Sequence, residues 1–568
     1  MRRGRPEGLT AGLTPHTRRQ QAYTRRNSSS RMGLVMNLSN TGRISFVIAA
    51  IALMGTLTAC GVNPVTKKKE IQFVSENEEL QIGEKNYSPT RQGEGGDLEV
   101  LPELTSYVNS VGQKLAAVSD RKLPYEFVVL NNSVPNAWAL PGGKIAVNRG
   151  LLTELQNESE LAAVLGHEIV HAAARHGAKA QERGTMMQIG MQAAQVGMAV
   201  GGVNSDLAGL ALGGASTGLQ MVQMKYGRDQ ELESDHYGMK YMKLAGYDPQ
   251  GAVTLQETFV RLSQAGGQKQ QSWLDGMFAT HPPSQERVDK NKAYAEKLAA
   301  KYGKGGEVGA EPFAAATQKL RQMKPAYDKY DQAMAAAEKK DFATAKALLA
   351  EASKMVPNEG SFQVLLGQIA LAEKQPQAAA GYFDKAMKLS PNYFASYLGA
   401  GVTQMQLNNK QKAEPYLTRS AQMLPTAPAA YYLGNIARDR GDTDTARKYY
   451  EAAASSQSSV GQAAAAEYMK MDLPQNPGNY VAAGAQQDSQ GRLMVVVQNR
   501  SKVSLKEIKV TPVLVDASGR IVQQGDPVAI QAVVKPGEQA AAATGLASLT
   551  PEQMQALRFR VDAAKIAE

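Results

Sequence analysis

The sequence of 568 residues contains one cysteine, Cys60. A disulfide within the chain is therefore excluded, and the fold must be held together by packing. Long apolar runs are also lacking. Residues 44–54 are too few to span a bilayer as a permanent helix. The methionine-rich stretch 184–202 is interrupted by Gln188, Gln192 and Gln195, which makes it too polar for a membrane span.

The positive charge is concentrated at the start of the chain. The net charge is +10, but residues 1–60 hold nine arginines, no lysine and one acid, Glu7, which is a net +8. The remaining residues therefore carry only +2, the difference between these two values. The charge gives no reason to expect binding to nucleic acid.

Residues 1–60 are predicted to be a basic extension followed by a lipoprotein signal peptide. Arg43 precedes the apolar run, which ends in Leu57-Thr-Ala-Cys60-Gly61 and resembles a bacterial lipobox. Removal of the signal would leave Cys60 at the N-terminus, carrying lipid. Glycine rather than aspartate at position 61 resembles lipoproteins of the outer membrane of Gram-negative bacteria. The alternative is an uncleaved anchor followed by a buried cysteine.

One predicted helix, Leu161–His171, carries a pattern with chemical meaning. His167 and His171 are four residues apart and differ by about 40° around the helix, so both imidazoles project from one face. Two neutral imidazoles at this spacing can share a tetrahedral cation, and Glu168 can take a proton from a water on that cation. This is the H-E-x-x-H signature of zinc metalloproteases. The alternative is a surface helix with incidental histidines.

The limits of this helix follow from its capping residues. Asn157 with Glu160 three positions later predicts the start, and Gly177 predicts the end. His176 would then point about 180° away from His167, which favours a structural or capping role over metal binding.

A later helix offers the third ligand. Glu231 and Asp235 lie at i and i+4 and share a face, whereas Glu233 is turned away. Glu231 would complete a His₂Glu set, and Asp235 would accept the N–H of a ligating histidine. A solvated acidic face is the alternative.

Four segments in this order resemble the HtpX/BepA-like family of gluzincin metalloproteases. They are Asn136-Ala-Trp-Ala-Leu-Pro-Gly-Gly143, His167-Glu-Ile-Val-His171, Glu231-Leu-Glu-Ser-Asp235 and Thr280-His-Pro282. The resemblance covers residues 61–300 and implies one Zn²⁺ per chain, held by His167, His171 and Glu231, with Glu168 as general base. In BepA-like members the histidine at the position of His281 lies on a loop that plugs the active site. His281 is therefore expected to be a plug or fourth ligand.

Other parts of the predicted site stay open. The donor to the oxyanion is expected among Arg228, His236 and Tyr237, which lie near the third ligand in sequence. Asn136 and Ala137 begin a predicted edge strand, with which an extended substrate could pair. Residues 184–224 are either a buried helical hairpin or a mobile lid.

Beyond a glycine-rich linker, residues 301–325, the chain repeats. Pro357, Pro391 and Pro425 are spaced by 34 residues, the period of the tetratricopeptide repeat. Residues 326–475 are predicted to be an α-solenoid whose concave surface binds a protein partner, or a plain spacer. Residues 476–568 combine short strands with turns and predict a small β-sandwich, either a docking module or a structural cap.

The predicted fold is multidomain, with a mainly helical α+β gluzincin protease domain, an α-solenoid and a small β-sandwich. The predicted function is a lipid-anchored zinc endopeptidase of the periplasm. Resemblance to BepA-like proteins implies quality control or maturation of outer-membrane and envelope proteins. Its substrates would be unfolded or misassembled envelope proteins, and the outer-membrane assembly machinery is a candidate partner for the repeats. The alternative is a chaperone-like scaffold with a latent protease head.

Overall fold

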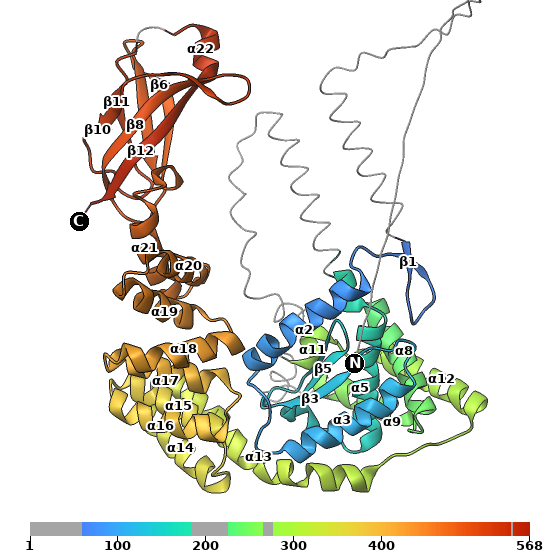
Figure 1. The fold of residues 1–568 in the computed structure, drawn as a ribbon. Helices are drawn as coiled ribbons and strands as arrows, with labels where there is room; N and C mark the ends of the chain where they lie inside the picture. Colours follow the sequence, from blue (N-terminus) through green and yellow to red (C-terminus); the bar gives the residue numbers. More distant parts are fainter. Residues whose placement is uncertain (1–59, 181, 183–224, 265–275, 547–548, 568) are drawn as a thin grey trace, which may run out of the picture. The chain divides into compact units, whose positions relative to one another are not determined.

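The structure is a computed structural model that describes residues 60–180, 182, 225–264, 276–546 and 549–567 (Figure 1). The predicted leader at 1–59 and the predicted hairpin or lid at 184–224 lie outside these residues. Residues Gly61–Glu568 form one compact unit, and the fold below is that of this unit. None of the helices that the structure describes is both long and apolar enough to cross a membrane.

A three-stranded sheet lies at the centre of the N-terminal part. Its order is β3 (Glu126–Leu130), β5 (Lys144–Asn148), β4 (Ala137–Leu140). β3 runs parallel to β5, whereas β4 pairs with β5 in antiparallel fashion and forms one edge of the sheet.

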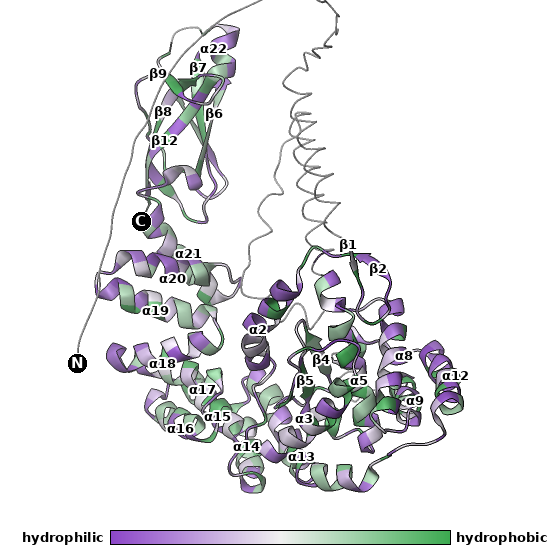
Figure 2. Ribbon diagram, turned by 45° about the vertical axis from the view of Figure 1, so that its right-hand side comes forward, coloured by the Kyte–Doolittle hydropathy of each residue, from purple (hydrophilic) through white to green (hydrophobic). Residues whose placement is uncertain are grey.

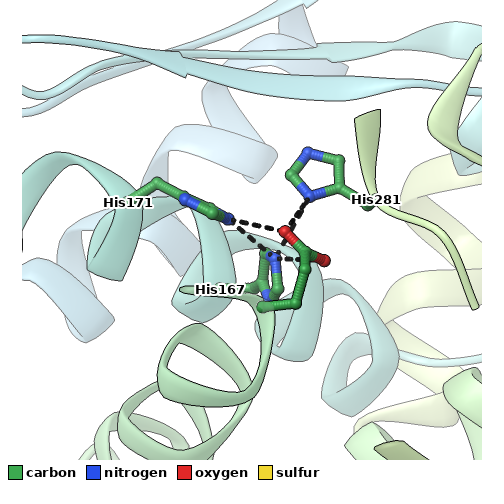
Figure 3. Close-up of side chains that lie close together, drawn as sticks. His167, His171 and His281 are labelled. Carbon is green, nitrogen blue, oxygen red and sulfur yellow. Dashed lines mark hydrogen bonds and ion pairs between the residues drawn. The ribbon is translucent and has the colours of Figure 1, made fainter. Parts of the chain in front are cut away.

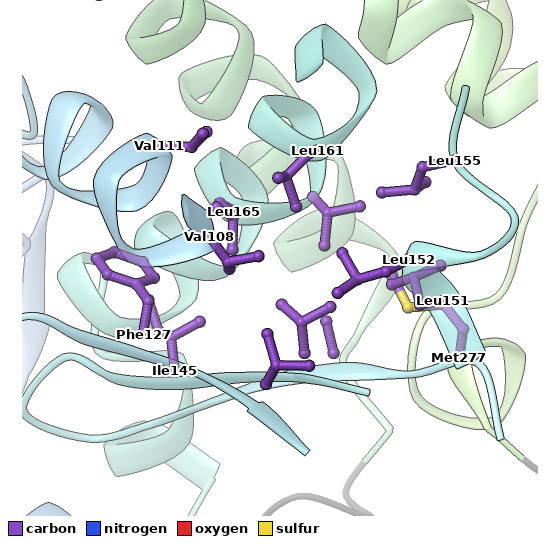
Figure 4. Close-up of a cluster of buried hydrophobic side chains, with 14 of the residues drawn as sticks. Val108, Val111, Phe127, Ile145, Leu151, Leu152, Leu155, Leu161, Leu165 and Met277 are labelled. Atoms are coloured by element: carbon purple, nitrogen blue, oxygen red, sulfur yellow. The ribbon is translucent and has the colours of Figure 1, made fainter. Parts of the chain in front are cut away.

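Side chains alternate between the two faces of this sheet, as the pleat requires. Phe127 and Ile145 point to one face, where they join Val108 of α3 (Pro102–Ala117) and Leu165 of α5 (Glu158–Ala173) in a buried core (Figure 4). On the other face the Trp138 ring meets the Tyr87 ring of α2 (Glu76–Gly93) edge-on. α5 is therefore packed between the sheet and other helices, and all its residues are buried.

Shorter strands and further helices complete this part of the chain. Hydrophobic residues concentrate on β4, β5 and α5, while α12 is largely hydrophilic (Figure 2). The remaining elements are β1 (Cys60–Val62), β2 (Lys69–Ile71), α4 (Arg149–Leu152), α8 (Arg228–Leu244), α9 (Gln250–Gln264), α11 (Met277–Thr280) and α12 (Gln285–Tyr302).

Helix pairs follow, and their second helices bury one pattern of small and large residues. The buried triplets are Ala345-Leu349-Ala352, Ala379-Phe383-Ala386, Ala413-Leu417-Ser420 and Ala446-Tyr450-Ala453. The large residue of a triplet packs against glycines on the first helices, where a side chain would collide with it. An added Cβ at Gly399 would lie 2.0 Å from the Phe383 ring. The helices are α13 (Ala310–Glu338), α14 (Phe342–Met355), α15 (Gly360–Ala372), α16 (Pro376–Leu389), α17 (Phe394–Gln406), α18 (Lys410–Met423), α19 (Ala427–Asp439), α20 (Thr443–Ala454) and α21 (Ser459–Asp472).

The segment expected to be a linker is largely helical. Residues 301–325 include the first half of α13, whose Phe313 and Leu320 are buried in the same core as α5. The glycine-rich stretch ends at Gly309, which caps α13 in a left-handed conformation. The alanine-rich sequence that follows has high helix propensity, which explains why the helix begins there.

The C-terminal part consists of two small sheets, ordered β11-β7-β6 and β10-β8-β12, with β9 also paired to β8. Val495 and Val497 of one sheet share a buried core with Ile508 and Val510 of the other. The elements are η1 (Pro477–Asn479), β6 (Val481–Gln487), β7 (Leu493–Asn499), β8 (Leu505–Val515), β9 (Ile521–Gln524), β10 (Val528–Ile530), β11 (Gln539–Ala543), α22 (Pro551–Ala556) and β12 (Leu557–Ile566).

Candidate metal centre

Four side chains meet in a buried cluster: His167, His171, Glu231 and His281 (Figure 3). Their potential ligand atoms all lie within 4.8 Å of one another. His167 Nε2 is 3.0 Å from His171 Nε2 and 3.3 Å from His281 Nδ1. Glu231 Oε1 is 3.1 Å from His281 Nδ1 and 3.5 Å from His171 Nε2. Three elements that are far apart in sequence, α5, α8 and the end of α11, thus supply one set of donors.

The separations in this cluster fit one tetrahedral metal ion. Ligands about 2.0–2.1 Å from zinc lie about 3.3–3.4 Å from one another at tetrahedral angles. Among His167, His171 and Glu231 the separations run from 3.0 Å between His167 and His171 to 3.6 Å between His167 and Glu231, while the set that includes His281 lies within 4.8 Å.

His167 and His171 turn Nε2 towards the cluster because the Nδ1 atom of each has a hydrogen-bond partner outside it. His167 Nδ1 donates to Asp235 Oδ1 at 2.9 Å. His171 Nδ1 lies 2.9 Å from His176 Nδ1, and His176 Nε2 lies 3.2 Å from Glu233 Oε1. We assign the proton of His176 to Nε2, so that His171 Nδ1 donates in turn. Asp235 turns His167 Nε2 towards His171 Nε2, 3.0 Å away, so that one cation can bind both nitrogens once neither carries a proton.

Arg287, which sequence reasoning missed, contacts both the ligand Glu231 and the carboxylate of Asp235, which orients His167. Its guanidinium donates to both oxygens of Asp235 at 2.7 Å and lies 2.8 Å from Glu231 Oε2. Burial raises the pKa of Glu231, but the charges of His281, Arg287 and His167 outweigh burial and leave that pKa well below its ordinary value. Glu231 is therefore a carboxylate, the form that binds a metal. In the sequence, Arg287 has no feature that separates it from other arginines at a helix start.

Glu168 lies beside the cluster with its charge unmatched by hydrogen bonds. The side chain is fully buried, and neither carboxylate oxygen has a hydrogen-bond partner among the described residues. His281 Nε2 lies 3.5 Å from Glu168 Oε1. Burial is the main influence on this carboxyl and raises its pKa. A buried acceptor without a donor fits a water or substrate group held at this position.

Helix α5 ends earlier than expected, and this early end determines where the His176 side chain lies. The helix ends at Ala173 rather than near Gly177, and Arg175 has a left-handed φ of 63°. Glu79 Oε2 accepts a hydrogen bond from Arg175 Nε at 2.9 Å and thereby holds this turn. The chain turns at Arg175, so His176 lies against His171 instead of pointing 180° away from His167. The angular argument from an unbroken helix was wrong because the helix does not continue through His176.

The contacts found for the three expected oxyanion donors lie outside the cluster. Arg228 is exposed and pairs with Glu286 of α12. The His236 ring packs on Tyr294, 3.7 Å between centroids, and Tyr237 lies beside Lys240. His236 and Tyr237 follow Asp235 by one and two positions, so each is rotated by about 100° per residue from the cluster. Closeness in sequence was a poor guide here.

Tyr226, just before α8, lies beside the cluster and was not among the expected donors. Its ring stacks on His171 with 3.8 Å between centroids and is 5.4 Å from the His281 ring. The Tyr226 N–H donates to the carbonyl of Thr280, which precedes His281. Burial raises the pKa of Tyr226, with smaller contributions from Glu168 and Glu231, so the phenol keeps its proton and can donate.

Asn136 and Ala137 lie at the edge strand. The carbonyl of Asn136 accepts a hydrogen bond from the N–H of Asn148 at 2.8 Å, and Ala137 begins β4. β4 pairs with β5 on one side, and no other strand of the described residues pairs with its second side. Cys60, the expected lipid site, begins β1.

Two family profiles match the chain. Residues 102–295 match peptidase family M48, a range that includes every residue of the cluster. Residues 330–394 and 398–467 match the tetratricopeptide repeat, which confirms the repeat prediction.

Three relatives show how far the similarity extends. A β-barrel assembly-enhancing protease of Yersinia pestis is 27% identical over 374 residues, which are 62% of this chain and 75% of the relative. The protein of that name from Escherichia coli K12 is 31% identical over 199 residues, 35% of this chain and 40% of the relative. The chain thus spans well under two thirds of that relative's length. Metalloprotease YcaL of Escherichia coli K12 is 31% identical over 192 residues, 33% of this chain and 70% of the relative. From the family match and this coverage of a relative at that identity, we conclude that the chain belongs to peptidase family M48.

Proposed function

We propose that the chain is a zinc-dependent endopeptidase. The observation that carries the proposal is the buried His167–His171–Glu231 cluster with the unpaired carboxylate of Glu168 beside it. Zinc is the metal of this family, and the separations and donor atoms of the cluster fit it.

The chemistry divides between the metal and the chain. When bound, zinc lowers the pKa of its water to ~7 and polarises the scissile carbonyl. Glu168 accepts the proton of the attacking water and returns it to the leaving amine. The raised pKa of Glu168 suits it to hold that proton between the two events. The Tyr226 hydroxyl donates to the developing oxyanion, and β4, through Asn136 and Ala137, pairs with the backbone of an extended substrate.

His281 holds the described form latent. Its Nδ1 lies in the ligand set and its Nε2 faces Glu168. These are the two directions in which a catalytic water would be held, so His281 occupies the place of that water. Proteolysis requires this side chain to leave.

The proposed setting is the periplasm of a Gram-negative bacterium, with the protein anchored to the outer membrane by lipid on Cys60. Substrates are unfolded or misassembled envelope proteins, and the repeats bind a protein partner. The outer-membrane assembly machinery is our candidate for that partner. The name of the relatives from Yersinia pestis and Escherichia coli supports this setting.

Glu168→Gln tests the proposal. This variant should keep zinc but lose at least 100-fold in peptide hydrolysis, because the general base contributes a factor of about 10²–10⁴. Glu103→Gln, an exposed change on α3, serves as the control and should retain activity. Complementation of a deletion strain by Glu168→Gln would support the chaperone-like scaffold instead.

His281→Ala tests the latency. Removing the imidazole frees the fourth position and should raise basal proteolysis of an unfolded substrate at least 10-fold. Gln285→Ala, an exposed change four residues later, should leave the rate unchanged. Equal or lower activity of His281→Ala would contradict a plug.

A further inference from the structure

The hairpin of residues 61–73, formed by β1 and β2, exposes apolar side chains. Val62 is 53% exposed, Ile71 59% and Phe73 50%. Ile71 and Phe73 are two residues apart and alternate with Gln72, so they share a direction in extended backbone. Apolar side chains gathered on an exposed surface indicate an interaction site.

Positive charge lies next to these apolar side chains. Lys67, Lys68 and Lys69 occupy the turn and the start of β2, and all three are exposed. None of them forms an ion pair with a carboxylate in the part of the chain that the structure describes. The next acid, Glu70, is already paired with Lys179 at 2.7 Å. The hairpin therefore presents three exposed positive charges, of which Lys67 also donates to the carbonyl of Pro64 and Lys68 acts on Glu233 through its charge.

The other side of the hairpin is fastened to the protease region. Asn63 Nδ2 donates to the carbonyl of Ala174 at 3.4 Å, directly after α5. The backbone N–H groups of Phe73 and Val74 both donate to Glu182 Oε1 at 2.9 Å. With the ion pair of Glu70, these contacts fix the direction in which the apolar side chains and lysines point.

We propose that this surface rests on an anionic lipid leaflet, the one to which the proposed lipid on Cys60 anchors the chain. The inference rests on that proposed anchor, since β1 begins at Cys60 and the hairpin cannot lie far from the leaflet. Apolar side chains enter the boundary between headgroups and acyl chains, while neighbouring lysines meet anionic headgroups. An unfolded substrate would account for the apolar side chains but not for three exposed lysines beside them.

Fluorescence quenching in vesicles tests the contact. In the lipidated protein the sulfur of Cys60 is a thioether, which does not react with maleimides, so an introduced cysteine is the only free thiol. Fluorophores are placed by Phe73→Cys and, in a second variant, by Ile71→Cys. The control is Val522→Cys on β9, which is 64% exposed and apolar but has no lysine beside it. The protein is reconstituted into phosphatidylethanolamine–phosphatidylglycerol vesicles that contain brominated lipid.

Quenching at positions 73 and 71 should exceed that at 522 at least threefold. It should fall when Lys67, Lys68 and Lys69 are changed to glutamate, and when phosphatidylglycerol is replaced by phosphatidylcholine. Equal quenching at 73 and 522 would overturn the proposal. So would a change of the label on addition of unfolded protein without lipid, which would identify a substrate surface. Mass spectrometry of the N-terminal peptide reports lipidation separately, so loss of the anchor is distinguished from failure of the hairpin to touch lipid.

Discussion

The protease region, residues 61–300, and the repeats bury different kinds of side chain. Each second helix of a repeat buries a short triplet of uncharged side chains, such as Ala379, Phe383 and Ala386. The protease region buries charges: Glu79 is 0% exposed and lies between Arg121 and Arg175. A repeat is stabilised by its neighbours along the chain. In the protease region, buried charged side chains pair with residues from elements distant in sequence. Substitutions there should therefore cost more unfolding free energy and affect a larger part of the fold.

The largest effect should follow from Glu79→Ala. The substitution leaves the buried guanidinium groups of Arg121 and Arg175 without their carboxylate and should cost about 3–5 kcal/mol of unfolding free energy. Urea unfolding is followed by the fluorescence of buried Trp138 in a Trp273→Phe background. Glu76→Ala is the control. Its carboxylate is 66% exposed and lies 3.5 Å from Arg121, so as a solvated ion pair its loss should cost less than about 1 kcal/mol. Equal losses in the two variants would mean that the buried carboxylate of Glu79 contributes no more to stability than the exposed one of Glu76, and that buried charges do not set the protease region apart.

A smaller, local effect is expected from Phe383→Ala. The ring is fully buried against Gly367 and Gly399, and its loss should cost about 3 kcal/mol. Amide hydrogen exchange should accelerate in α15–α17 while α5 stays protected, since repeats interact mainly with their neighbours. Tyr382→Ala, at a half-buried position, is the control. Equal acceleration in α5 would show that the two regions unfold together.

The smallest change in free energy should follow from Asp235→Asn. It concerns zinc binding and is confined to the metal centre. The amide lacks the charge that orients His167 and balances Arg287, so zinc affinity should fall about 10–100-fold. Titration against a competing chelator measures it. Asp229→Asn, at an exposed position of the first turn of α8, should leave the affinity unchanged. A change of less than about twofold in Asp235→Asn would mean that His167 is oriented without that charge.

The comparison also explains what could be predicted from the sequence. The repeats were readable because their packing repeats with the chain: Ala345, Ala379 and Ala413 are all buried at the same position of successive units. The spacing of His167 and His171 was readable for a similar reason, since one helix sets both directions.

The rest of the site depends on contacts between distant residues. His176 reaches His171 only because the chain turns at Arg175, and Glu79, 96 positions earlier, holds that turn. Arg287 meets Asp235 across 52 positions. Neither contact leaves a periodic pattern in the sequence. The expected donors Arg228, His236 and Tyr237 were chosen by closeness in sequence, which says nothing about the direction of a side chain on a helix.

His281 has a further consequence for how substrates compete. If His281 plugs the site as proposed, the plug never diffuses away, so a substrate binds only the fraction of molecules in which His281 has left the site. If about one molecule in a hundred is open, every apparent dissociation constant is about 100-fold weaker than the intrinsic one. A passing protein at low concentration then escapes cleavage, whereas a protein held nearby for long enough does not. The plug would therefore select substrates by their residence time near the protease rather than by their sequence.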